Sequence, residues 1–176
     1  MDWNESIAVQ PLSQEAFAPY GWVLGKPFPT TQDSVAFINA VTDFRSEHVF
    51  DCGSGGQPEI LWVSYRNAAA TVATLEVHHL TQQAIVPLNG DIVHFVAAST
   101  DDGVPDLRTL SAFRVINGAG ICMRPGCWHA TRVAGGEVAC LMLTRRSTTA
   151  DLVDHLHGKR TAVESAMFDI APVTFV

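Results

Sequence analysis

Charged residues are scarce in this chain, and basic residues are the scarcer kind. Of the 176 residues only 16% are charged, and 11 Lys and Arg stand against 18 Asp and Glu, which gives a formal net charge of -7 and a pI near 5.3. This balance argues against nucleic acid or an anionic membrane surface as the main partner. A small anionic substrate is still compatible, because one or two buried arginines are enough to bind it.

Long hydrophobic runs and a disulfide framework are also missing. No segment approaches the roughly 20 apolar residues of a membrane span. The N-terminal MDWNESIAVQ lacks the basic start and apolar run of a signal peptide. The four cysteines, Cys52, Cys122, Cys127 and Cys140, show no CxxC spacing. We therefore expect reduced, inert thiols in a cytoplasmic protein.

The chain is rich in short apolar runs separated by turn residues. Its 47% hydrophobic content is typical of a globular protein, and Asn89-Gly90 between two such runs predicts a β-hairpin. The runs span residues 60–65, 71–80, 84–88, 92–98, 111–116, 120–123, 128–133 and 138–143. Many short strands at regular spacing predict an antiparallel barrel or sandwich.

Two short helices are predicted outside these strands. Ser13 is a suitable N-cap for a helix that ends near Pro19 and Gly21. In STTADLVDHLHGK, a threonine cap and Asp151 precede apolar residues at helical spacing, and Gly158 lies where a helix would end.

The segment LEVHHLTQQAIVPLNGD, residues 75–91, contains the main candidate site. In a strand, Glu76 and His78 share one face. Ionisable groups rarely face a barrel interior unless they are paired or bind a metal. With Gln83, and with His129 of the later GCWH turn, these residues could supply oxygen and imidazole ligands to one divalent ion.

The spacing of these residues resembles the two motifs of the cupin superfamily, G-x5-H-x-H-x(3,4)-E-x6-G and G-x5-P-x-G-x2-H. Glu76 and His78 stand at the two histidine positions of the first motif, and Gln83 stands at its glutamate. His129 stands at the histidine of the second motif, in which Arg124 replaces the proline. The resemblance implies that these four positions hold one divalent metal (nickel, manganese, zinc or iron), with no organic cofactor.

Four longer segments resemble the ureidoglycolate lyase family in the same order. They are PLSQEAFAPYGWVL, LEVHHLTQQAIVPL, PDLRTLSAFRV and GICMRPGCWHA, and together they cover about residues 9–145. The residues that match the family pattern directly are Glu76, His78, Gln83, Trp128 and His129.

This resemblance implies the fold and the assembly. We expect an all-β, cupin-type antiparallel β-barrel (a double-stranded β-helix, or jelly roll) with a short N-terminal helix. The whole chain, 1–176, is expected to form a single domain, with the barrel at about 35–145 and a C-terminal helix and tail at 148–176. The family further implies a homodimer.

The family's reaction is cleavage of a C–N bond. Ureidoglycolate is a small anion that carries a hydroxyl and a urea nitrogen on one carbon. The resemblance implies that the chain splits it, or a related carbinol or amide acid, into glyoxylate or another oxo acid and urea or another amide. A metal would act as a Lewis acid. Without metal, His78 and His129 would be acid and base, and Glu76 would orient an imidazole.

An arginine is expected to bind the substrate carboxylate in bidentate fashion. Arg66, Arg124 and Arg132 are the nearest candidates by motif position. Trp128 and Asn39 are further candidates for substrate contact, and Asn39 begins an NAVT segment in place of the family's NGGT.

Several departures from the family leave other functions open. Val77 replaces an arginine, Ala130 a histidine and Arg145 an aspartate, and the C-terminal helix is additional to the family segments. One alternative is a metal-dependent cupin isomerase or dioxygenase that acts on a small organic acid. The other is a non-catalytic cupin that binds a small acid.

Overall fold

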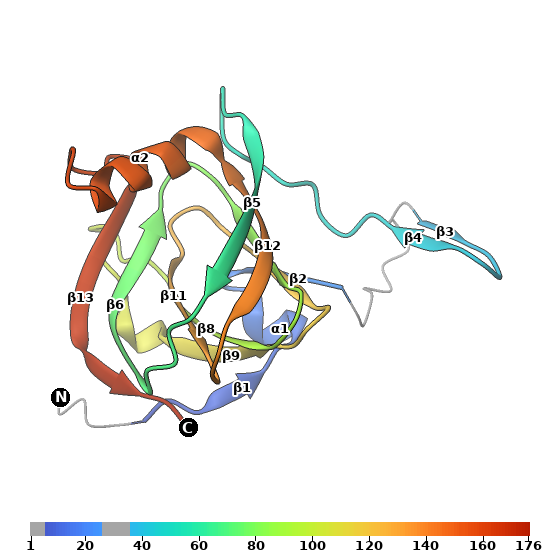
Figure 1. Cartoon of the computed structure of the whole chain (residues 1–176), viewed down its shortest axis with the longest axis horizontal. Coiled ribbons are helices and arrows are strands. Elements are labelled where there is room, and N and C mark those ends of the chain that lie inside the picture. The colour runs from blue at the N-terminus through green and yellow to red at the C-terminus, as the bar shows by residue number, and fades with distance from the viewer. Residues whose placement is uncertain (1–5, 26–35) are drawn as a thin grey trace.

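The protein folds into two β-sheets packed face to face, with a separate two-stranded arm (Figure 1). The computed structural model describes residues 6–25 and 36–176. The six-stranded sheet contains, in spatial order, β1 (Val9–Pro11), β9 (Ser111–Val115), β8 (Ile92–Ala97), β11 (Trp128–Val133), β6 (Thr71–His78) and β13 (Ser165–Thr174). The five-stranded sheet contains β2 (Gly21–Leu24), β10 (Gly120–Met123), β7 (Gln83–Pro87), β12 (Val138–Arg145) and β5 (Pro58–Tyr65). The arm consists of β3 (Ala36–Ile38) and β4 (Asp43–Arg45).

Successive strands from β5 to β8 alternate between the two sheets, since β5 and β7 lie in one sheet and β6 and β8 in the other. In the described part of the chain, the paired strands are antiparallel, except that β1 runs parallel to β9. This winding confirms the predicted cupin-type double-stranded β-helix.

The six-stranded sheet buries apolar residues on both of its faces. Val96 packs in the core between the sheets, opposite residues such as Ile85 of β7. Its chain neighbour Phe95 points the other way and joins a second cluster with Leu75 and Trp128. A strand of this sheet can therefore place alternate residues in two different buried environments.

The strands extend beyond the predicted barrel limits of 35–145. At the C-terminal end, β13 pairs with β6, and this pairing places Ser165 opposite His78. At the N-terminal end, β1 and β2 pair with β9 and β10. The tail predicted at 148–176 thus includes a sheet strand, while the assignment of the chain to a single domain stays a prediction.

The Asn89-Gly90 turn does not form the predicted hairpin. It joins β7 to β8, which lie in different sheets and do not pair with each other. The Asn89 side chain accepts a hydrogen bond from the Ala139 backbone N–H at 2.8 Å, so the turn is held by β12. A Cβ at Gly90 would lie 2.9 Å from the Val138 side chain, which explains why glycine fits this corner.

The N-terminal helix, α1 (Gln14–Phe17), is capped as predicted: Ser13 Oγ accepts the Ala16 N–H at 3.2 Å. A short 3-10 turn, η1 (Leu107–Thr109), precedes β9. No helix in residues 6–25 or 36–176 is both long enough and apolar enough to cross a membrane.

The C-terminal helix, α2 (Arg146–Leu156), begins earlier than predicted and has no threonine cap. Arg145 is its N-cap residue and makes no side-chain capping hydrogen bond. Asp151 instead accepts the backbone N–H groups of Val163 and Glu164, at 2.9 and 2.8 Å. Burial alone would raise the pKa of Asp151, but these two N–H groups and Arg160 together lower it. The carboxylate thus ties α2 to the segment before β13.

His94 is a fully buried histidine of the core. Its Nδ1 lies 3.1 Å from Thr131 Oγ1, and its Nε2 lies 3.1 Å from Met123 Sδ. Burial, and then the neighbouring His129, lower the pKa of His94 well below its ordinary value. The folded protein therefore holds this ring neutral, whereas the unfolded chain takes up a proton near pH 6.5.

The buried ring should make stability depend on pH. Because the folded pKa is depressed, the contribution of His94 is fully present above the unfolded pKa and is lost as the pH falls below about 6.5. We expect the free energy of unfolding to fall by up to about 1.4 kcal/mol per pH unit for this proton. Urea unfolding in the presence of chelator should show a smaller pH dependence in His94→Leu than in the unsubstituted protein. Equal pH dependence in the two proteins would contradict the assignment.

Candidate active site

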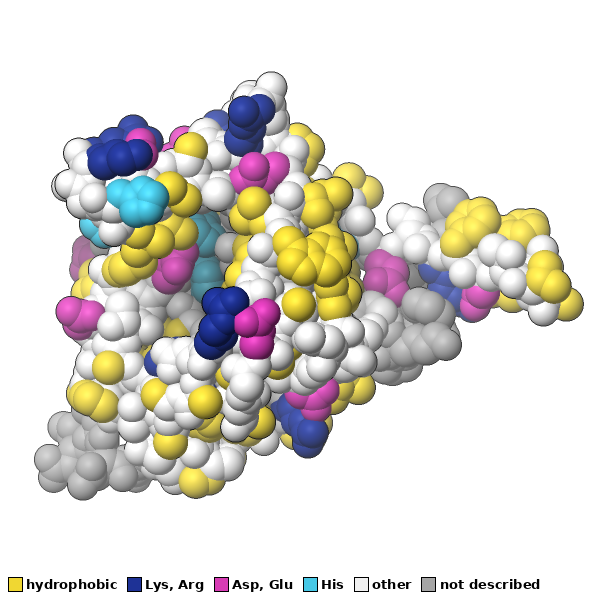
Figure 2. All heavy atoms as spheres, in the orientation of Figure 1, with side chains coloured by type: hydrophobic (Ala, Val, Ile, Leu, Met, Phe, Trp, Pro, Cys, Tyr) yellow, Lys and Arg dark blue, Asp and Glu magenta, His cyan; other side chains and the backbone are white. Residues whose placement is uncertain are grey.

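A cavity of about 270 Å³ opens into the barrel beneath α2. Figure 2 shows histidine side chains recessed in a hollow between α2 and β5. The lining residues come from five strands and one helix: Leu61, Val63, Tyr65, Glu76, His78, Gln83, His129, Ala130, Thr131, Met142, Thr144, Thr148, Thr149, Leu152 and Val153. All four predicted ligand positions are among them.

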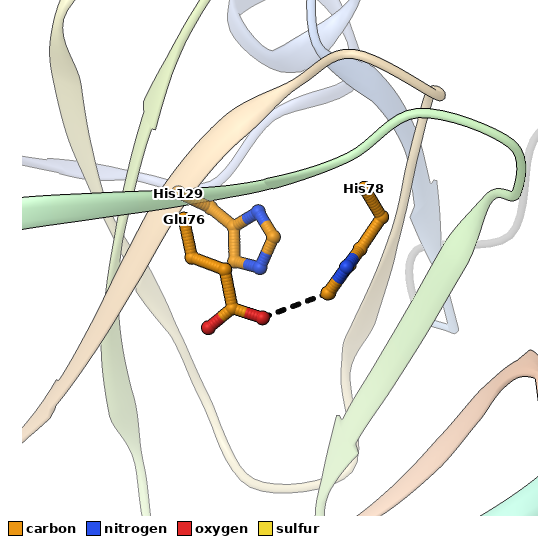
Figure 3. A group of neighbouring side chains, drawn as sticks. All are labelled: Glu76, His78 and His129. Carbon is orange, nitrogen blue, oxygen red and sulfur yellow. Dashed lines mark ion pairs between the residues drawn. The ribbon is translucent and has the colours of Figure 1, made fainter. Parts of the chain in front are cut away.

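Glu76, His78 and His129 form the centre of the site (Figure 3). Glu76 and His129 are directly opposite each other on the neighbouring strands β6 and β11. Glu76 Oε1 lies 3.1 Å from His78 Nε2, and the two histidine rings are 5.2 Å apart between centroids. One ligand atom from each residue lies within 4.8 Å of the other two, which is compatible with a shared metal ion.

Both histidines are held through the nitrogen that faces away from this group. His129 Nδ1 lies 3.0 Å from the Cys127 carbonyl oxygen, which can only accept, so Nδ1 donates this hydrogen bond and Nε2 is the nitrogen left for a metal. His78 Nδ1 lies 2.9 Å from Ser165 Oγ on β13. Such outer partners orient the imidazoles of metal sites.

Burial, followed by the neighbouring His129 and His79, lowers the pKa of His78 to about 3. The His78 ring is therefore neutral near pH 7. A neutral imidazole can ligate a metal, but it cannot donate a proton as an imidazolium acid.

Gln83 reaches the same group from the opposite sheet, at the start of β7. Its Nε2 lies 2.9 Å from His78 Nε2, while its Oε1 is buried without a hydrogen-bond partner among the described residues. A half-turn of the amide exchanges the two atoms and directs the oxygen toward His78. The donor set would then be two imidazole nitrogens and two side-chain oxygens, which suits a divalent metal such as nickel, manganese, zinc or iron.

The remaining polar lining consists of hydroxyl groups. Tyr65 of β5 is half-buried, and burial of its hydroxyl raises its pKa, so the hydroxyl stays protonated. Thr131 and Thr144 add two further hydroxyls from β11 and β12. Among the described residues that line the cavity, none is Arg or Lys.

The three predicted carboxylate-binding arginines lie outside the cavity. Arg66 is exposed and pairs with Glu137, with 2.6 Å between Nε and Oε2. Arg132 donates to the backbone carbonyls of Thr71 and Thr131. The Arg124 guanidinium lies over the Trp22 ring, 4.1 Å from its centroid. Each guanidinium is thus engaged elsewhere, and the structure does not bring any of them to the site.

The other two predicted contacts are also displaced. Trp128 precedes His129 on β11 and so faces the opposite side of the sheet, where it packs edge-to-face against Phe168. Asn39 lies in the turn of the β3–β4 arm, where its Oδ1 accepts the N–H groups of Val41 and Thr42. Neither residue lines the cavity.

Several lining residues were not predicted. Tyr65 was detectable, because it alternates with Leu61 and Val63 along one strand face. The sequence does not indicate that Ser165 contacts His78, because this contact depends on the pairing of β13 with β6 across 87 positions. The α2 residues repeat at helical spacing, but the sequence does not show which sheet end the helix covers.

Comparisons with known proteins identify the family to which the chain is similar. A family model described as ureidoglycolate lyase matches residues 4–164. This match includes α2, so the helix lies within the family region and is not additional to it.

Individual relatives carry the same description. Ureidoglycolate lyase of Pseudomonas syringae pv. syringae (strain B728a) is 33% identical over 129 residues, which cover 70% of this chain and 72% of that protein. The Escherichia coli O139:H28 protein of that name is 31% identical over 134 residues, covering 70% and 76%. Among solved structures, RmlC from Streptococcus suis in complex with dTDP-D-xylose is similar, with a TM-score of 0.47 at 12% identity, over 80% of this chain and 70% of that one. The chain belongs to the ureidoglycolate lyase family and, by that membership, is an enzyme of the lyase class.

Proposed function

We propose that the chain cleaves the C–N bond of ureidoglycolate, or of a closely related carbinol amide acid, to give glyoxylate and urea or the corresponding amide. The observation that carries this proposal is the convergence of Glu76, His78, Gln83 and His129 in one cavity of a family member. The cavity, at about 270 Å³, also suits a small molecule.

The reaction balances without an oxidant or a reductant. The substrate hydroxyl loses its proton, the oxygen forms a C=O bond to the same carbon, and the C–N bond breaks. The released nitrogen takes up one proton and leaves as urea. The Glu76 carboxylate has a second oxygen besides the one near His78, and we assign this oxygen as the base that carries the proton from hydroxyl to nitrogen.

A divalent metal held by Glu76, His78, Gln83 and His129 would supply a Lewis acid for the developing oxyanion. The chain keeps the His78 imidazole neutral and fixes both rings, His78 through Ser165 and His129 through the Cys127 carbonyl. Tyr65 adds a hydroxyl that stays protonated and can donate to the substrate. The described lining offers no Arg or Lys to the substrate carboxylate, so binding of the anion is expected to depend on metal.

No described residue specifically favours an isomerase, a dioxygenase or a non-catalytic acid-binding protein. The cytoplasmic location stays a prediction, as does the absence of nucleic acid and membrane partners.

The central carboxylate and imidazole should be required for turnover. We expect Glu76→Gln and His129→Ala to lower kcat/KM for ureidoglycolate at least about 100-fold, because each removes a proton carrier or ligand. Glyoxylate release above the spontaneous rate is the measurement. Arg66→Ala, at an exposed ion pair outside the cavity, is the matched control and should keep nearly full activity. Full activity in both site variants would place the chemistry elsewhere.

Metal should matter for binding as well as for turnover. Chelation is expected to abolish substrate binding measured by calorimetry, and addition of nickel, manganese, zinc or iron should restore it. Glu76→Gln should also weaken uptake of the metal ion itself, measured without substrate, since a neutral amide is a poorer ligand. Undiminished binding and turnover in chelator would support metal-free acid–base chemistry.

We also propose a homodimer. The arm carries Phe37 and Phe44, whose rings stack at 5.4 Å yet are 48% and 58% exposed. On β5, Ile60 and Trp62 are 69% and 70% exposed. Figure 2 shows apolar side chains on the arm and over β5 on the same side of the molecule. An isolated two-stranded hairpin is marginally stable in water, and a twofold-related copy would cover both patches at once.

Sedimentation velocity should therefore show a dimer. The double substitution Phe44→Ser with Trp62→Ser is expected to shift the population to monomer, because it removes apolar area from both patches. Val104→Ser, at an exposed apolar residue of the loop between β8 and η1, belongs to neither patch and should leave the dimer intact. A monomeric unsubstituted protein would contradict the homodimer, and a dimer that survives the double substitution would contradict these patches as its interface.

A further inference from the structure

Helix α2 forms one wall of the candidate active site. Thr148, Thr149, Leu152 and Val153 line the cavity, and their spacing of i, i+1, i+4 and i+5 places them on one face of the helix. The two threonines supply the polar groups of this wall, and the two aliphatic residues supply none. The wall can therefore contact the part of a substrate that lies away from Glu76, His78 and His129.

The Thr148 hydroxyl donates its proton to the Glu164 carboxylate. Its side chain is almost fully buried, and its Oγ1 lies 2.6 Å from Glu164 Oε2. An ionised carboxylate can only accept, so the threonine donates its proton to Glu164. Thr149 likewise donates to a backbone carbonyl, that of Arg145, at 3.4 Å. Neither hydroxyl then has a proton left to donate, so each threonine can only accept a hydrogen bond from a ligand.

Glu164 is fixed in the position that imposes this direction. Ser147 Oγ donates to the same Oε2 atom at 3.0 Å, and Arg145 Nε lies 3.6 Å from it. Arg145 is held in turn by the Cys52 carbonyl oxygen, 3.1 Å from Nη1. The network holds the Glu164 carboxylate as a fixed acceptor for the Thr148 proton, so the threonine oxygen is preset as a hydrogen-bond acceptor.

We propose that Thr148, flanked by Thr149, is a specificity-determining residue that accepts a hydrogen bond from the terminal amino group of the substrate's ureido group. This inference rests on the proposed function. Ureidoglycolate ends in an NH2 group with two donors, whereas N-acetyl-2-hydroxyglycine carries a methyl group there and is otherwise matched. Leu152 and Val153 offer no side-chain acceptor, so the wall depends on its threonine oxygens to satisfy the amino group.

The test compares the two substrates in three proteins loaded with metal: the unsubstituted chain, Thr148→Val and Thr148→Ser. The unsubstituted enzyme should prefer ureidoglycolate in kcat/KM. Thr148→Val keeps the shape but removes the acceptor, and should reduce this preference about fivefold to 100-fold, the range expected for one lost hydrogen bond to a buried donor. Thr148→Ser keeps the hydroxyl and should retain most of the preference. Activity on the acetyl compound should change little in either variant.

The substrate ratio separates recognition from a general structural effect, because a distorted site would lose both activities together. Loss of the ratio in Thr148→Val and its retention in Thr148→Ser support the proposal. An unchanged ratio in Thr148→Val overturns it and leaves the proposed lyase function intact. Glyoxylate from neither substrate in the unsubstituted enzyme overturns the proposed function and this inference with it.

A second comparison covers the case in which Thr148→Val does not fold, as judged by its thermal transition. Thr148→Cys and Thr148→Ser are close in size, but sulfur is a weak acceptor. The cysteine variant should then show the reduced preference and the serine variant should not. Equal preferences in these two variants would overturn the proposal.

Discussion

Three histidines lie side by side inside the barrel, and the interior accommodates them because each ring has a hydrogen-bonding partner. His129 lies between His78 and His94, at ring distances of 5.2 and 5.7 Å. A proton on one buried ring would be repelled by any charge on the next, and burial already disfavours it. The partners of these rings come from separate strands and turns: Ser165, Thr131 and the Cys127 carbonyl. The strands of the six-stranded sheet must therefore pair in this register for the histidine rings of the site to have their hydrogen-bonding partners.

A second buried polar network holds helix α2 in place over the cavity. Asp151, Glu164 and Arg145 are charged and largely buried, and each has partners that offset the loss of water. The result is a short helix fixed at both its start and its middle, although its own capping is poor. This explains how a helix of marginal length can form a defined wall.

Local rules predicted the parts of the site that local geometry determines. The period of two along a strand places Glu76 and His78 on one face, and the motif spacing brought Gln83 and His129 to the same cavity. The misplaced residues depended on long-range pairing. Asn89-Gly90 looked like a hairpin, but its strands joined different sheets. Alternate residues of β11 face opposite sides of the sheet, so the strand turns His129 inward and Trp128 outward. The motif spacing of the three arginines does not reveal the ion pair, carbonyls and aromatic ring that hold them away from the cavity.

The pairing of β6 with β13 has a consequence for the order of events during synthesis. His78 and its partner Ser165 are 87 positions apart in the chain. Val163 and Glu164, which bind Asp151 of α2, come just before Ser165 in the sequence. A nascent chain that has exposed β6 cannot close this edge of the sheet until the chain through β13 has also been made. Until then, a strand with ionisable groups on one face and apolar groups on the other stands open at a sheet edge. The nascent polypeptide is thus most vulnerable to misassociation in the interval between the synthesis of β6 and that of β13.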